Sequence, residues 1–157
     1  MMRFQQVFDM SYTTELTEDC MGIVHVGTGV VRGQDLIEAC KSTLALLQAT
    51  ENFHYEFIDF SDTTELCITP VDFEQIIAQD HFAALLRPEA VVVIVAPDDE
   101  IFQTVQEWDR RVQDIGWKTH LSRSRAPALK WLRENYPKPA DSVAAESGGT
   151  LSELDAS

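Results

Sequence analysis

Apolar and polar positions recur along this chain in two patterns, one typical of strands and one typical of helices. In the first ten residues Phe4, Phe8 and Met10 fall on alternate positions, which predicts the first strand of a hairpin. A polar connection rich in Thr, Glu and Asp follows, and the second strand is expected from about Cys20 to Val31. Glycines near the end of that strand predict a bulge or a turn there.

From residue 34 onward, amphipathic helical segments alternate with short apolar strands. The segment Thr69-Pro70-Val71-Asp72 has the form of a helix start, with a threonine N-cap and proline at the first helical position. The uninterrupted apolar run 91–95 predicts a central strand covered on both faces. The patterns together predict helices at about 34–49, 70–87, 98–115 and 127–136, strands at 53–60, 91–95 and 118–121, and a loop at 61–64.

The predicted order is strand, strand, helix, strand, helix, strand, helix, strand, helix. Strands that alternate with helices are joined by right-handed crossovers, so we expect an α/β fold with a mixed, mostly parallel five-stranded sheet and flanking helices. The composition changes after Tyr136, where few large apolar residues remain. We therefore expect a single domain at residues 1–136 and a flexible acidic tail at residues 137–157.

The net charge of the chain limits the kinds of molecule that it is expected to bind. The 157 residues include 12 basic and 26 acidic side chains, a formal net charge of -14. Such a chain repels phosphate backbones, so we expect no nucleic acid as partner. No apolar run is long enough to span a bilayer and the start lacks the features of a secretory signal, so we expect no membrane insertion and a cytoplasmic location. The three cysteines lack metal or redox spacing and are expected to be reduced thiols.

Basic side chains gather late in the chain, in contrast to the acidic first half. This cluster predicts either contact with an acidic partner, including the acidic half of a second copy in a homodimer, or an ordinary solvated helix face. Its members are Lys118, Arg123, Arg125, Lys130 and Arg133.

Two groups of carboxylates follow predicted parallel strands. Asp59 and Asp62 come after one strand, and the run 98–100 (Asp-Asp-Glu) comes after the next. Carboxylates that meet at the carboxyl ends of strands can bind Mg²⁺, as in phosphoacceptor domains. Helix capping and Asx turns account for the same residues, and the lysine that such domains carry after the last strand is missing here. We assign no metal site.

Nucleophilic catalysis would depend on Cys67, near a helix start that lowers its pKa, with His25 or His54 as base. No third, orienting group follows from the spacing. A dinucleotide-binding loop at 27–33 would need glycine where Arg32 stands. We therefore expect no enzymatic activity and no cofactor.

Four segments of the chain resemble the SpoIIAA-like, or STAS-like, bacterial family. They are Gly27–Leu36, Ile58–Asp62, Ala90–Pro97 and Ala128–Leu132, within a likeness that extends over roughly residues 4–136. The resemblance implies a small mixed sheet flanked by helices and a regulatory module that is not an enzyme. It also implies a relation to anti-anti-sigma factors and to lipid-binding CRAL-TRIO domains.

The resemblance further implies where a regulatory site would lie. In anti-anti-sigma proteins, a serine at the start of the helix after the third strand is phosphorylated by a partner kinase. Residues 65–70 lack the Asp-Ser-Ser/Thr-Gly motif, and Thr69 is the nearest hydroxyl. A phosphate on Thr69 would meet the positive end of a helix, and Thr69 also fits a plain N-cap.

Three functional hypotheses remain open at this point. The first is a non-enzymatic interaction module that binds a protein partner through the helix after the third strand and through Asp59, Ser61, Asp62 and Thr69. The second is a carrier or sensor of a small apolar, lipid-like ligand held between helices and sheet by Phe57, Phe73 and Trp108. The third is a Mg²⁺-dependent phosphoacceptor.

Overall fold

The computed structural model describes residues 11–136; the predicted strand at 4–10 and the predicted tail at 137–157 lie outside the described residues. Within this range the strands and helices follow one another in the predicted order. They are β1 (Tyr12–Leu16), β2 (Gly22–Arg32), α2 (Gly33–Ala49), β3 (Tyr55–Cys67), α3 (Pro70–Leu86), β4 (Val91–Val95), α4 (Asp99–Gln113), β5 (Lys118–Ser122) and α5 (Arg125–Asn135).

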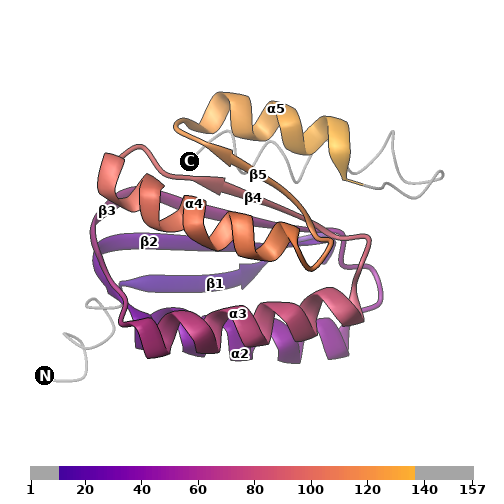
Figure 1. Ribbon diagram of the computed structural model, residues 1–157. Helices are drawn as coiled ribbons and strands as arrows, with labels where there is room; N and C mark the ends of the chain where they lie inside the picture. Colours follow the sequence, from indigo (N-terminus) through magenta and orange to yellow (C-terminus); the bar gives the residue numbers. More distant parts are fainter. Residues whose placement is uncertain (1–10, 137–157) are drawn as a thin grey trace, which may run out of the picture.

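The five strands form one mixed sheet in which they lie side by side in sequence order. β1 pairs with β2 in antiparallel fashion, and the other neighbouring strands are parallel. Helices α2, α3 and α4 pack on one face of the sheet, and α5 packs on the other (Figure 1). The α/β class and the mostly parallel five-stranded sheet predicted from the sequence are confirmed.

Strand β1 occupies residues that were expected to form a polar connection. It pairs with β2 from Tyr12↔Gly27 to Leu16↔Ile23. Tyr12 and Leu16 pack against the apolar core, and Thr14 hydrogen-bonds His25 of the neighbouring strand at 2.9 Å. Threonine and tyrosine suit a half-buried edge strand despite their polarity, which is why the expectation of a connection was wrong here.

Strand β3 is longer than expected and includes residues 61–64, which the sequence analysis treated as a loop. β2 continues to Arg32 and keeps pairing with β3 as far as Cys67, so Asp62 and Thr63 lie opposite Thr28 and Gly29 in the sheet. Two register shifts interrupt this pairing, one between Val26 and Thr28 and one between Gly29 and Val30. Gly29 has a φ of 65°, a left-handed conformation that glycine adopts without strain, and the predicted bulge is confirmed.

Side chains along the central strands alternate between the two faces of the sheet. In β3, Ile58 and Phe60 join the core beneath α2, α3 and α4, whereas Tyr55 and Phe57 join a second core beneath α5. β4 divides its residues in the same way, and all five are buried. The sheet is therefore covered on both faces, as the continuous apolar run 91–95 predicted.

Helix starts follow the predicted chemistry. Thr69 Oγ1 accepts a hydrogen bond from Asp72 N, and Asp72 Oδ2 accepts one from Thr69 N, both at 3.1 Å. Asp98 Oδ2 accepts from the backbone N–H groups of Glu100 and Ile101 at the start of α4. These caps satisfy amides that a helix leaves unpaired at its N-terminus. Within residues 11–136, no helix has both the length and the apolar character needed to cross a membrane.

Candidate functional site: a cavity between the sheet and three helices

A cavity lies between the sheet and helices α2, α3 and α4. Its volume is about 80 Å³. Its walls are largely apolar and include four aromatic side chains, from Tyr12, Phe60, Phe73 and Trp108. We name this space the interlayer cavity, and its lining residues come from β1, β2, β3, β4, α2, α3 and α4.

The helical walls of the interlayer cavity follow from helical periodicity. α2 contributes residues 36, 39, 40 and 43, and α3 contributes 73, 76, 79, 80 and 83, spacings that place side chains on one helix face. Ala39 and Ala83 belong to these sets, and both are buried. Small side chains at two inward positions leave space between helices and sheet that a leucine would fill.

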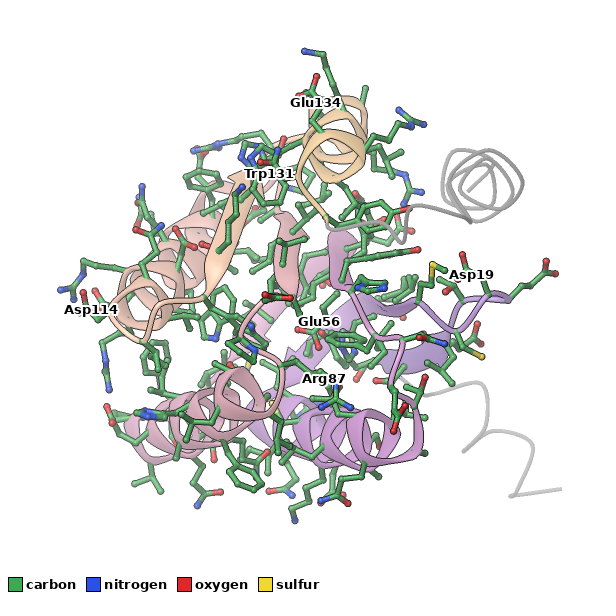
Figure 2. The ribbon with its side chains drawn as sticks, turned by 90° about the vertical axis from the view of Figure 1, so that its right-hand side faces the viewer. Asp19, Glu56, Arg87, Asp114, Trp131 and Glu134 are labelled. Atoms are coloured by element: carbon green, nitrogen blue, oxygen red, sulfur yellow. The ribbon has the colours of Figure 1, made fainter. Side chains whose placement is uncertain are left out.

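Polar side chains are buried at the sheet side of the cavity. His25 Nε2 lies 2.9 Å from Glu56 Oε2, and both residues are buried. The other ring nitrogen of His25 is bonded to Thr14, and the Tyr12 ring stacks on the imidazole with centroids 5.4 Å apart. Figure 2 shows Glu56 in the interior of the molecule, whereas Asp19, Asp114 and Glu134 lie at its periphery. Thr43 Oγ1 is 3.5 Å from His25 Nε2.

A second carboxylate, Asp80, enters the cavity from α3. Trp108 Nε1 donates a hydrogen bond to Asp80 Oδ2 at 2.6 Å, and Cys40 Sγ donates to Oδ1 at 3.8 Å. Burial, and then the charge of Glu56, raise the pKa of Asp80 to about 7, although the bonds from Trp108 and Cys40 act in the opposite direction. Asp80 therefore changes its charge near neutral pH.

The acidic character of the cavity also affects its neighbours. Burial, and then the charge of Glu56, raise the pKa of Tyr12 well above its ordinary value. Burial, and then the charge of Asp80, raise the pKa of Cys40 in the same way. Both groups are therefore neutral at physiological pH.

The structure brings together two of the three residues proposed from the sequence to hold an apolar ligand. Phe73 and Trp108 line the interlayer cavity. Phe57 does not, because it lies on the opposite face of β3 in the core beneath α5. That part of the expectation is corrected by the alternation of side chains along the strand. Glu56 and Asp80 were not proposed as site residues, and His25 was considered only as a catalytic base. The position of Glu56 between Tyr55 and Phe57 is a signal for a buried polar group.

The residues proposed as a partner surface do not form one cluster. Asp59 is buried, accepts a bond from the Ser61 backbone N–H at 2.9 Å and forms an ion pair with Arg125. Ser61 and Asp62 are exposed on β3, and Thr69 is exposed at the start of α3, where it caps the helix. Asp59 therefore ties β3 to α5, and the two exposed β3 residues and Thr69 remain available to a partner.

The carboxylates considered for Mg²⁺ have other partners in the structure. Asp59 pairs with Arg125, Asp99 pairs with Arg123, and Asp98 caps α4. Within the described range, no three histidine, cysteine, aspartate or glutamate residues are grouped so that they would hold a metal ion. These contacts favour capping and ion pairing for these residues over a shared cation.

Cys67 lacks the environment expected of a nucleophile. Its thiol is exposed, and its hydrogen bond with Glu65 raises its pKa, the reverse of the lowering expected near a helix start. The helix start that follows Cys67 therefore does not lower the pKa of this thiol. The cause is the carboxylate two residues before it, which disfavours the thiolate.

Comparison with known proteins gives likenesses of fold. No family model and no curated protein matches the chain. Among solved structures, the anti-sigma factor antagonist SpoIIAA in its unphosphorylated form is similar with a TM-score of 0.49 and 8% identity, over 78% of this chain and 97% of that chain. An uncharacterised DUF3478-family protein with a SpoIIAA-like fold, from Shewanella loihica PV-4, is similar with a TM-score of 0.45 and 17% identity, over 77% and 91%. The relation to CRAL-TRIO domains stays a prediction.

Proposed function

We propose that this protein is a non-enzymatic sensor or carrier that binds a small, mainly apolar ligand in the interlayer cavity. The observation that carries the proposal is the cavity itself, an apolar space with a few convergent polar groups, which is the usual form of a small-molecule site. We place the protein in the cytoplasm, where its three cysteines, free in the structure, would stay reduced.

The size of the cavity limits the ligand. A volume of about 80 Å³ corresponds to roughly five to eight water-sized spheres. A short chain fits this space, a single substituted ring requires small displacements of the lining side chains, and a complete lipid would require α3 or α4 to move. We therefore narrow the lipid-like ligand expected from the sequence to a compact molecule.

An empty space of this size has a cost in stability. At about 24 cal/mol for each Å³ of cavity, 80 Å³ corresponds to about 2 kcal/mol. Larger side chains at Ala39 or Ala83 would recover part of it, since both positions face the cavity. A stability cost that one substitution would remove supports a role for the space in binding.

A larger side chain that fills the cavity should stabilise the fold and at the same time weaken ligand binding. We expect Ala83→Leu to raise the free energy of unfolding by about 0.5–2 kcal/mol and to weaken the binding of cyclohexanol at least tenfold. The measurement is a ¹H–¹⁵N NMR titration of the full chain, with shifts expected around Phe73 and Trp108. Ala78→Leu, an exposed position on the same helix, is the matched control and should bind like the wild type. Unchanged affinity in Ala83→Leu would contradict the proposal.

A second candidate function is favoured by the outer face of α3. Val71, Phe82 and Leu85 are exposed by 66%, 49% and 68%, and in the described range these are the exposed large hydrophobic residues. Their spacing is close to whole helical turns, so they form one stripe on the helix that also walls the cavity. Acidic side chains far outnumber basic ones in residues 1–86. We propose that a partner protein with a basic, apolar segment binds this stripe, together with the exposed Ser61, Asp62 and Thr69.

The α3 stripe can be tested without disturbing the cavity. We expect the double variant Phe82→Ser, Leu85→Ser to fold with the wild-type unfolding temperature, since both side chains are exposed. Cross-linking followed by mass spectrometry should identify a partner whose contact segment is basic and apolar, and this cross-link should be lost in the variant. A cross-link that the variant retains, or an acidic contact segment, would count against the second candidate.

A further inference from the structure

We propose that the ligand of the interlayer cavity is a small organic amine, whose ammonium group is held by Asp80 and Glu56 and whose apolar body packs against Phe73 and Trp108. The inference rests on the proposed function, because it names the class of ligand for that same cavity. Three features of the cavity wall lead to it: its hydrogen-bonding groups, its charge and its aromatic faces.

The hydrogen-bonding groups of the wall favour a ligand that donates. The side-chain oxygens of Glu56, Asp80 and Gln79 are acceptors, and Gln79 Oε1 is buried with no hydrogen-bond partner in the described range. Three donors of the wall already have acceptors inside the protein: Trp108 Nε1 and Cys40 Sγ bind Asp80, and Thr104 Oγ1 binds the carbonyl of Glu100. A ligand with N–H donors satisfies the acceptors, whereas a carboxylate or phosphate would add further acceptors to them.

The charge of the wall favours a cation. No lysine or arginine belongs to the lining, so His25, bonded to Glu56, is its one basic side chain within the described range. A bare metal ion needs more oxygen ligands than two carboxylates supply, and no group of three suitable side chains is present in residues 11–136. An organic ammonium needs fewer ligands: two or three hydrogen-bond acceptors for its N–H groups and an apolar surface for its carbon atoms.

The aromatic side chains of the wall provide that surface. Tyr12, Phe60, Phe73 and Trp108 line the space together with aliphatic and polar side chains. Aromatic faces attract organic cations, and the attraction grows where water is excluded. The same rings would pack against an uncharged body, which distinguishes this wall from a site for a fully hydrated polar molecule.

The environment of Asp80 predicts how amine binding depends on pH. The titratable groups that face Asp80 are Glu56 from β3, Cys40 from α2 and Tyr12 from β1, and Trp108 of α4 donates to it. Burial and Glu56 keep the carboxyl partly protonated near pH 7. An ammonium favours the ionised form, so amine binding should release a proton from Asp80 and strengthen between pH 5.5 and pH 8.

Three probes of matched shape test the inference. Cyclohexylamine, cyclohexanol and methylcyclohexane differ in a single substituent, and each is titrated against the full chain by NMR at pH 8. We expect the amine to bind at least tenfold more tightly than the alcohol. Asp80→Asn and Glu56→Gln should each remove most of this preference, while Asp62→Asn, an exposed carboxylate on β3, should leave it unchanged. Amine affinity should also fall at pH 5.5 in the wild type and not in Asp80→Asn.

The outcomes distinguish this inference from the function on which it rests. If the alcohol and the hydrocarbon bind in the cavity as tightly as the amine, the amine inference is overturned and the apolar site stands. If none of the probes shifts the resonances around Trp108, both are overturned. An amine preference that persists in Asp80→Asn and Glu56→Gln, or that Asp62→Asn also lowers, would show attraction to the acidic surface and overturn the inference.

Discussion

Arg125→Met is expected to lower the free energy of unfolding by about 3 kcal/mol, one of the two largest effects that we predict. Arg125 forms an ion pair with Asp59, whose side chain is only 8% exposed. Breaking a buried pair by removing one partner typically costs about 3–5 kcal/mol, because the other charge stays buried without compensation. The value expected here is at the lower end, because the Arg125 side chain is 25% exposed. Chemical denaturation monitored by circular dichroism provides the measurement.

Two further variants show whether the ion pair is the cause. Arg110→Met removes an exposed arginine that pairs with Glu107 on the surface, and it should cost no more than about 0.5 kcal/mol. The double variant Asp59→Asn, Arg125→Met removes both charges and should recover part of the loss. If Arg125→Met is as stable as Arg110→Met, Asp59 does not depend on α5 for its charge balance and the structural role given to it here is wrong.

Asp80→Asn is expected to stabilise the protein at pH 8, by up to about 4 kcal/mol. The pKa of Asp80 is raised in the folded protein from 3.8 to about 7, and each unit of difference corresponds to about 1.36 kcal/mol. The folded state therefore loses stability as pH rises from about 4, where the unfolded chain ionises, to about 7, where the folded carboxyl ionises. Asparagine has no charge to desolvate, and its carbonyl can still accept the bond from Trp108.

The pH dependence of the difference in unfolding free energy between wild type and Asp80→Asn shows whether ionised Asp80 destabilises the folded protein. Near pH 4 the two proteins should have similar unfolding free energies, and the advantage of Asp80→Asn should grow until about pH 8 and then remain constant. Ionisable groups that do not interact with Asp80 contribute equally to both proteins and cancel. Asp62→Asn, at an exposed site, should show no such trend. A variant that is less stable than the wild type at pH 8 would mean that Asp80 is stabilised by partners in its charged form.

Much of the fold could be predicted from the sequence because its strongest signals are local. The uninterrupted run 91–95 and the threonine, proline and aspartate at 69–72 specify a buried strand and a helix start without reference to the rest of the chain. β1 and the second half of β3 were missed because their residues are polar. Their strand conformation depends on pairing with β2, a contact between distant segments that local pattern does not contain.

Only those residues of the candidate site that lie on helices could be predicted from the sequence. Phe73 and Trp108 belong to apolar helical stripes that must face the sheet, and both line the cavity. Phe57 was misplaced because β3 is buried on both faces, so an apolar side chain carries no sign of which face it occupies. Glu56 stands out in the sequence because it lies between Tyr55 and Phe57, whereas Asp80 lies between the polar residues Gln79 and His81. The proximity of Glu56 and Asp80 arises from packing α3 against the sheet, which only the three-dimensional structure contains.

A crystal structure of the full chain grown with saturating cyclohexylamine tests the central claim most directly. The account predicts electron density for the ring between Phe73 and Trp108, with its nitrogen within hydrogen-bond distance of the Asp80 carboxylate. Density confined to the outer surface, or a structure in which the side chains of Phe73 and Trp108 fill the space themselves, would contradict the claim that the space between the sheet and α2, α3 and α4 is a binding site.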